Sequence, residues 1–256
     1  MTSLLRLIQQ RHSERGPFDA DRSIEESHLN MILDAARWAP TPHNMQNFEI
    51  LVVDDPKRLE IIKELRSDAS EAFLRESYAQ LSFSEADLAK KTTGLLGSAF
   101  PAAWTNPEAW RPDSDYRSQL AFVHNWMRET PMLLIVFHDK RMRAPGSAGD
   151  VLGNVGLGCV MENMWLMCEF LGIGFQALSA FSNEEVEKQL RQVCELPEWA
   201  QIGFACRIGY ASGSAEGSMR VRRDLEQICH HNRFGDRSLT LHGARLNDET
   251  NVVLSR

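Results

Sequence analysis

The stretch Arg11-His12-Ser13-Glu14-Arg15 carries two guanidinium groups and a hydroxyl at alternate positions. In an extended segment, Arg11, Ser13 and Arg15 would point to one side, because side chains alternate along a strand. Two planar guanidinium groups on either side of a hydroxyl suit a phosphate or another anion with several oxygens. The alternative is a set of solvated surface side chains. The stretch therefore indicates an anion site that the rest of the chain has to support.

The composition is typical of a soluble globular protein. The chain has 256 residues, of which 43% are apolar and 25% are charged, and this length suits one large domain or two small ones. The net charge of -7 predicts that the molecule as a whole repels nucleic acid and anionic membranes. An anion site must therefore be a local basic pocket.

The cysteines and the N-terminus predict a cytoplasmic protein. The five cysteines are odd in number and contain no CxxC pair, which indicates free thiols in a reducing compartment. The first ten residues are too short and too polar for a signal peptide. Because no run of about 18 apolar residues is present, we expect no membrane-spanning helix.

Apolar periodicity predicts helices and strands around one sheet. A capping box at residues 23–26 opens a helix that Pro40 and Pro42 stop. The continuous apolar run at 48–53 predicts a strand in the centre of the sheet. Further helices are expected at 4–8, from 56, and at 150–171 and 183–194, and further strands at 132–137, 175–181 and 201–210. The expected fold class is α+β, a small sheet wrapped by helices.

The expected domain organisation is one domain over residues 1–233, with an excursion near 66–117 and a polar tail at 234–256. Within the excursion, residues 98–117 lose periodicity and carry Trp104 and Trp110. Irregular insertions of this length are often lids or binding loops. The alternative for the two tryptophans is packing of the loop against the body of the domain.

Motifs for metal binding and covalent catalysis are missing from the sequence. His230 and His231 are adjacent, so their rings do not readily converge on one metal ion. There is no G-x-S-x-G motif. Gly153, Gly156 and Gly158 do not follow an expected strand, so they indicate close helix packing rather than a dinucleotide fingerprint.

Two other polar clusters are candidates for a binding site. Asn44 and Gln46 lie in a loop stiffened by prolines, and their amides can read the edge of a heterocycle; the alternative is a helix end followed by a turn. Arg220 and Arg222 belong to a basic cluster near the C-terminus, whose alternative is a solvated arm. Basic clusters at opposite ends of an acidic chain can share one phosphate.

In combination, these segments resemble the nitroreductase-like flavin enzymes over about residues 5–228. The matching segments are 11–18, 39–48, 150–174, 196–198 (Leu-Pro-Glu), 208–210 (Ile-Gly-Tyr) and 222–225 (Arg-Arg-Asp-Leu). The resemblance implies an α+β nitroreductase-like fold with a central, mainly antiparallel sheet wrapped by helices, assembled as an intertwined homodimer. It also implies FMN as cofactor, NADH or NADPH as electron donor, and a small-molecule electron acceptor such as a nitroaromatic or a quinone.

The resemblance further implies which residues contact FMN. The N-terminal stretch would supply phosphate and ring contacts, the loop at 44–46 would reach the flavin of the partner subunit, and the turn at 178–179 would lie near the ring. Arg11 and Arg222 are the candidates for the phosphate. The full set of expected contacts is Arg11, His12, Ser13, Arg15, Asn44, Gln46, Leu178, Ser179, Arg220 and Arg222.

The reaction expected from the resemblance is a ping-pong hydride transfer, in which the cofactor carries the chemistry and no catalytic side chain is required. The chain departs from the family at residues 47–48, where Pro-Trp is common, and at Ser179 and Ala180, where an acidic residue and a glycine are common. Other reactions of the same fold therefore stay open: reductive dehalogenation, flavin fragmentation and heterocycle dehydrogenation. A non-catalytic flavin sensor and a module without cofactor also stay open.

Overall fold

The computed structural model describes residues 4–67, 127, 129–147, 149–212, 220–223, 225–241 and 251–254. The chain divides into two compact units, one formed by residues 1–69 and 116–215 and the other by residues 70–115 and 216–256. Most of the predicted excursion, including Trp104 and Trp110, lies outside the described residues. The predicted boundary at residue 233 stays a prediction.

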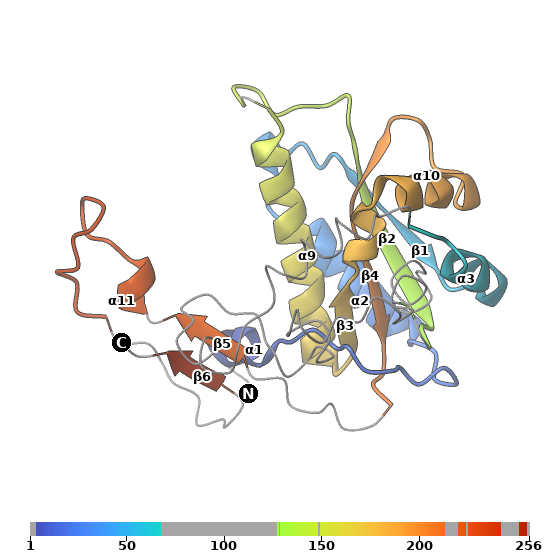
Figure 1. The fold of residues 1–256 in the computed structure, drawn as a ribbon, viewed down its shortest axis with the longest axis horizontal. Coiled ribbons are helices and arrows are strands. Elements are labelled where there is room, and N and C mark those ends of the chain that lie inside the picture. Colours follow the sequence, from blue (N-terminus) through green and yellow to red (C-terminus); the bar gives the residue numbers. More distant parts are fainter. Residues whose placement is uncertain are drawn as a thin grey trace, which may run out of the picture. The chain divides into compact units, whose positions relative to one another are not determined.

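The first unit is built on a four-stranded antiparallel sheet. Its strands are β1 (Phe48–Val53), β2 (Met132–Asp139), β3 (Gly174–Ala177) and β4 (Ala200–Gly209), in the order β1-β2-β4-β3 (Figure 1). Each neighbouring pair is antiparallel. The predicted α+β class and the mainly antiparallel sheet are therefore confirmed.

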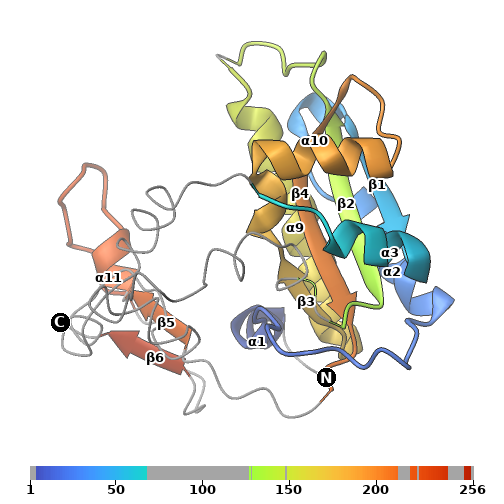
Figure 2. The same cartoon turned by 45° about the vertical axis from the view of Figure 1, so that its right-hand side comes forward.

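Helices cover both faces of this sheet (Figure 2). One cluster of buried side chains joins the sheet to α2 (Glu26–Arg37) and α9 (Val151–Leu171), and a second joins it to α3 (Pro56–Lys63) and α10 (Glu184–Val193). Along β2, Leu134 belongs to the first cluster and Leu133 to the second, since successive side chains point to opposite faces. A strand covered on both faces has to be apolar throughout.

The prediction that residues 48–53 form a central strand was wrong in its position. The strand has the predicted bounds, but β1 stands at the edge of the sheet that the described residues form. Ile50 packs against the first cluster, whereas Val53 belongs to the second. The apolar run thus reflects two covered faces, which is a different property from having two neighbouring strands.

The helix ends follow local chemistry at most of the predicted places. The side chain of Asp55 accepts from the backbone N–H of Arg58 at the start of α3, and α9 ends at Gly172, which has a φ of 68°. The side chain of Asn183 caps α10 as predicted. The predicted capping box at 23–26 was wrong, because α2 begins at Glu26 without a side-chain cap.

The remaining elements are short. In the first unit these are α1 (Leu4–Gln10) and the 3-10 turns η1 (Pro42–Asn44) and η4 (Ser179–Ser182). In the second unit they are β5 (Arg220–Arg223), α11 (Leu225–Ile228) and β6 (Asn251–Leu254), with β5 parallel to β6.

Helix α9 is the one helix in the described part of the chain that is long and apolar enough, by length and composition, to cross a membrane. The sequence analysis expected no such helix. The central helix of a globular fold passes the same test, and here Val160, Met164 and Cys168 of α9 are buried in the first cluster. These contacts place one face of α9 in the core beside the sheet, and 28% of its apolar stretch is buried.

Candidate functional site

Residues 11–18, called the N-terminal segment below, cross β3 and β4 at a pair of glycines. Gly174 and Gly209 are partners across the ladder, and the Phe18 ring lies over both. A Cβ atom at either glycine would stand 2.7 Å from this ring, which is closer than real Cβ contacts. The glycine pair therefore provides the space that brings the segment against the sheet.

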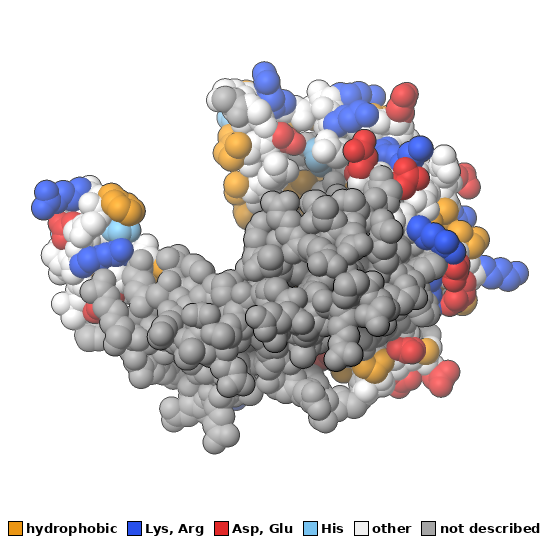
Figure 3. Space-filling model, in the orientation of Figure 1, with side chains coloured by type: hydrophobic (Ala, Val, Ile, Leu, Met, Phe, Trp, Pro, Cys, Tyr) orange, Lys and Arg blue, Asp and Glu red, His pale blue; other side chains and the backbone are white. Residues whose placement is uncertain are grey.

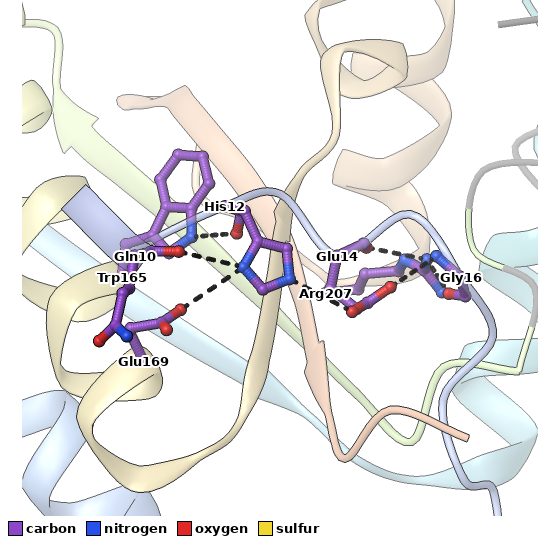
Figure 4. A network of polar contacts seen from close by, with 7 residues as sticks. All are labelled: Gln10, His12, Glu14, Gly16, Trp165, Glu169 and Arg207. Atoms are coloured by element: carbon purple, nitrogen blue, oxygen red, sulfur yellow. Dashed lines mark hydrogen bonds and ion pairs between the residues drawn. The ribbon is translucent and has the colours of Figure 1, made fainter. Parts of the chain in front are cut away.

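Polar contacts fix the middle of the segment (Figure 4). The backbone N–H of Glu14 donates to the Phe175 carbonyl at 2.9 Å, and the Glu14 carboxylate accepts from the backbone N–H of Gly16 at 2.9 Å. Glu14 is buried, whereas Arg15 is exposed. The inward direction of Glu14 leaves the Arg15 side chain on the solvent side.

One face of α9 holds the start of the segment. Glu162, Trp165 and Glu169 follow the i, i+3, i+7 spacing of a single helix face. The Arg11 guanidinium carbon lies 4.2 Å from the Trp165 ring centroid, which is cation–π distance. The Trp165 indole N–H donates to the backbone carbonyl of His12 at 3.0 Å (Figure 4). Trp165 therefore positions the side chain of Arg11 and the backbone carbonyl of His12.

The His12 imidazole lies between two carboxylates. Its Nδ1 is 3.7 Å from Glu169 and its Nε2 is 3.6 Å from Glu14 (Figure 4). The ring is partly exposed. Both distances are longer than a hydrogen bond. His12 Nδ1 also lies 3.3 Å from the backbone carbonyl of Gln10, which can only accept, so Nδ1 is the donor in that contact.

Arg11 retains hydrogen-bonding capacity. Its Nε lies 3.2 Å from the Glu162 carboxylate, yet this buried nitrogen has no partner in hydrogen-bond geometry among the described residues. A buried polar donor without a hydrogen bond is costly. The Arg11 guanidinium therefore suits an additional anionic oxygen, such as that of a phosphate.

The Arg15 guanidinium keeps its positive charge although the neighbouring chain removes part of its hydration. Although Arg15 is exposed, desolvation by the chain around its guanidinium lowers the pKa of Arg15, and the nearby charge of Glu14 opposes this shift. An arginine stays protonated at neutral pH after such a shift. The segment thus presents two guanidinium groups, one stacked on α9 and one directed toward solvent.

The loop before β1 has unusual backbone geometry. His43, Asn44 and Gln46 have φ values of 51°, 55° and 47°, a region that residues other than glycine rarely adopt. The loop is closed by the Gln46 side-chain amide, which donates to the Asn44 side chain at 3.1 Å, and by the Gln46 N–H, which donates to the Thr41 hydroxyl at 3.1 Å. Strained and exposed amides of this kind are common at binding sites.

Within one chain, this loop and the N-terminal segment meet different parts of α9. Pro42 of the loop lies against Gly156 of α9, whereas His12 of the N-terminal segment accepts a hydrogen bond from Trp165 of α9. These positions are nine residues apart, a rise of roughly 13 Å along a helix. The loop and the N-terminal stretch thus contact α9 about two and a half turns apart.

The other predicted site residues lie in both units. Leu178 is buried, and its N–H donates to the Ala205 carbonyl at 2.8 Å, so the turn at 178–179 is tied to β4. Ser179 begins η4 and is exposed. Arg220 and Arg222 lie on β5 of the second unit, and their role in the site stays a prediction.

The sequence analysis missed Trp165 and Arg207. Arg207 is fully buried in β4 and donates to backbone carbonyls of the N-terminal segment. A single charged residue inside the apolar run of residues 202–208 was the available signal, because buried charges need dedicated partners. Trp165 gave no signal, since a tryptophan in an apolar helix usually packs in the core.

Comparisons with known proteins identify the family of the chain. The family model described as the Nitroreductase family matches residues 8–210. A protein named NADPH-dependent oxidoreductase from Staphylococcus haemolyticus is 21% identical over 226 residues, which cover 88% of this chain and 72% of that protein. Its namesake from Staphylococcus saprophyticus is 22% identical over 228 residues, covering 89% and 72%.

Solved structures share the fold. An FMN-dependent nitroreductase from Clostridium difficile superimposes with a TM-score of 0.55 at 17% identity, over 90% of this chain and 100% of that chain. A protein from Desulfovibrio desulfuricans, named as a nitroreductase and solved in complex with FMN, gives 0.52 at 19% identity, over 91% and 99%. Because the family model spans most of the sequence, the chain belongs to the nitroreductase family.

Proposed function

We propose that this protein is an FMN-dependent oxidoreductase that uses NADH or NADPH to reduce a small acceptor such as a nitroaromatic or a quinone. Family membership supports the oxidoreductase class. The names of the curated relatives support a nicotinamide donor, and the neighbouring structures support FMN. When bound, FMN supplies hydride transfer in a ping-pong sequence. The chain binds and orients the cofactor and shields it from competing reactions.

The observation that carries the proposal is the state of Arg11. Its guanidinium is stacked on Trp165, and its buried Nε makes no hydrogen bond among the described residues. A phosphate oxygen would satisfy such a donor with a charge-assisted bond. Arg11 and Ser13 would hold the phosphate end, and Arg15 would add positive charge toward the ring. Arg222, on β5 of the second unit, stays a candidate for phosphate binding that the family resemblance suggests.

The proposed assembly is a homodimer that shares its two sites. Along α9, Val151, Val155 and Phe170 are each about 60% exposed, and hydrophobic side chains line the part of α9 visible in Figure 3. Exposed apolar side chains repeated along a core helix mark an interaction surface. In this assembly, Asn44 and Gln46 of one subunit would contact the FMN of the other, as the family resemblance implies.

The remaining proposals follow from the same assignment. The enzyme would act on small molecules in the cytoplasm, in agreement with five cysteines that are all free. The turn at 178–179, tied to β4 through Leu178, would present backbone groups to the flavin ring.

The test is steady-state NADPH and NADH oxidation by the purified, FMN-loaded protein, with a nitroaromatic and a quinone as separate acceptors. Turnover that depends on both FMN and acceptor supports the proposal. A protein that binds FMN but turns over with neither acceptor points to a sensor or to another reaction of the fold. A colourless protein that fails to take up added FMN contradicts the proposal entirely.

A further inference from the structure

Arg207 is a fully buried arginine on an inner strand of the sheet. It has no exposed surface, and its strand β4 lies between β2 and β3. Charged side chains are rarely buried to this degree unless their donors are satisfied, because removing the charge from water is unfavourable. A leucine or methionine would fill the same space without this cost, so the guanidinium calls for a specific explanation.

The contacts of the guanidinium point to the N-terminal segment. Nη2 donates to the backbone carbonyl of Gly16 at 2.6 Å and to that of Glu14 at 3.3 Å. Nε donates to the Gln176 side chain at 2.8 Å, and the group lies 4.4 Å from the Phe18 ring centroid. The two carbonyls held by one nitrogen are those on either side of Arg15.

We propose that Arg207 is a positioning residue for the cofactor site. By holding the carbonyls of Glu14 and Gly16, it fixes the backbone that carries Arg15 and thereby the direction of the Arg15 side chain. This inference rests on the proposed function, since it assigns Arg207 to the binding of FMN through residues 11–15. Arg207 itself touches neither cofactor nor substrate in this proposal.

The shape of the guanidinium explains why an arginine stands here. Its nitrogens diverge in one plane, so one group can bind Gln176 on β3 through Nε and the segment through Nη2. Gln176 is the ladder partner of Arg207, which places the two side chains together. A lysine ammonium has its donors at a single point and cannot bridge both. The Arg207→Lys variant keeps the charge and loses the bridge.

The first experiment measures FMN affinity by flavin fluorescence titration in Arg207→Lys and Arg207→Met. We expect binding to weaken by roughly tenfold or more, as for the loss of one charge-assisted hydrogen bond. The matched control is Arg191→Met, because Arg191 also donates to a backbone carbonyl, that of Pro197 at 3.2 Å, but lies on α10. The control should lower stability without changing FMN affinity.

A double-mutant cycle separates positioning from general stability. In an Arg15→Ala background, Arg207→Lys should change FMN affinity by less than about twofold, because the side chain that it positions is already gone. Equal effects in both backgrounds would overturn the proposal, as would wild-type affinity in a folded Arg207→Lys protein. If Arg207→Met does not fold, Gln176→Ala provides a second test, with a smaller loss of affinity in the same direction.

Trypsin cleavage tests the same residue without FMN. The bond between Arg15 and Gly16 should be cut faster in Arg207→Lys than in wild type or Arg191→Met, because the carbonyls on both sides of Arg15 are released. Equal cleavage rates would overturn the proposal. If wild type binds no FMN, the proposed function fails, and the trypsin result alone decides whether Arg207 positions the segment.

Discussion

At the scale of single residues, the site depends on what holds Arg11. Its guanidinium is placed between a carboxylate of α9 and the face of an indole. The indole provides attraction without using the N–H donors, and Glu162 leaves Nε outside hydrogen-bond geometry. Arg11 is therefore held in place while it retains donors for an anion.

Arg11→Ala should weaken FMN binding by about 1–3 kcal/mol, because one charge-assisted contact to the phosphate is lost. Fluorescence titration of the apoprotein measures this difference. Arg141→Ala is the matched control, since Arg141 is exposed and pairs with Asp139 away from the segment. Wild-type affinity in Arg11→Ala would remove Arg11 from the site.

Trp165→Phe separates the two roles of the indole. An aromatic face toward Phe175 and Arg11 is kept, although as a smaller phenyl ring, whereas the N–H bond to the His12 carbonyl is lost. We expect FMN affinity to fall by about 0.5–1.5 kcal/mol, the usual net value of one hydrogen bond. Trp38→Phe, at a side chain that is 75% exposed, should have no effect; equal effects of the two changes would contradict this role.

At the scale of elements, the glycine pair of β3 and β4 decides where the N-terminal segment lies. Gly209→Ala would place a methyl group 2.7 Å from the Phe18 ring and should destabilise the fold by about 1–3 kcal/mol through overpacking. Urea unfolding measures the change. Lys188→Ala is the control, because Lys188 is an exposed residue of α10 that pairs with Glu185 on the same helix, and it should change stability by less than about 0.5 kcal/mol. A Gly209→Ala protein as stable as wild type would show that the ring can move aside.

Local patterns predicted most elements because their causes are local. The apolar run at 48–53 matched β1 in both bounds, and Asn183 capped α10, since strand alternation and capping depend on neighbouring residues. The order of strands in the sheet depends on distant pairing, so the edge position of β1 was not predictable. The predicted capping box at residues 23–26 does not form, because α2 begins at Glu26 without a side-chain cap.

Candidate residues in loops were easier to predict than the residues that support them. Arg11 and Asn44 stand in polar stretches where their chemistry is visible in the sequence. The contacts of Trp165 and Arg207 join positions 153 and 191 residues apart, and neither pairing follows from spacing. The resemblance to a family implied the cofactor, whereas only the structure identified these supporting contacts.

At the scale of the whole molecule, buried thiols should make stability depend on alkaline pH. Burial raises the pKa of Cys168 and of Cys206. Unfolded thiols have a pKa of about 8.5, so the unfolded state loses these protons first as pH rises. The stabilising contribution is complete below about pH 8 and should then decline by up to about 1.4 kcal/mol per pH unit for each thiol.

Urea unfolding at a series of pH values from about 7 to 10 tests this dependence. Cys206→Ala should lower stability at all pH values but reduce its decline above about pH 9, because one buried thiol is removed. The matched control is Val160→Ala, at a fully buried residue of the same cluster that carries no titratable group, which should lower stability and leave the decline unchanged. An identical decline in all three proteins would exclude the buried thiols as its cause.

The central claim concerns the whole enzyme, which is proposed to take hydride equivalents from a nicotinamide through bound FMN. The most direct measurement is anaerobic titration of the FMN-loaded protein with NADPH or NADH, followed by the visible absorbance of the flavin. We expect the absorbance to be lost at one nicotinamide per bound FMN and to return when a nitroaromatic or quinone is added. A flavin spectrum that neither nicotinamide changes would contradict this claim.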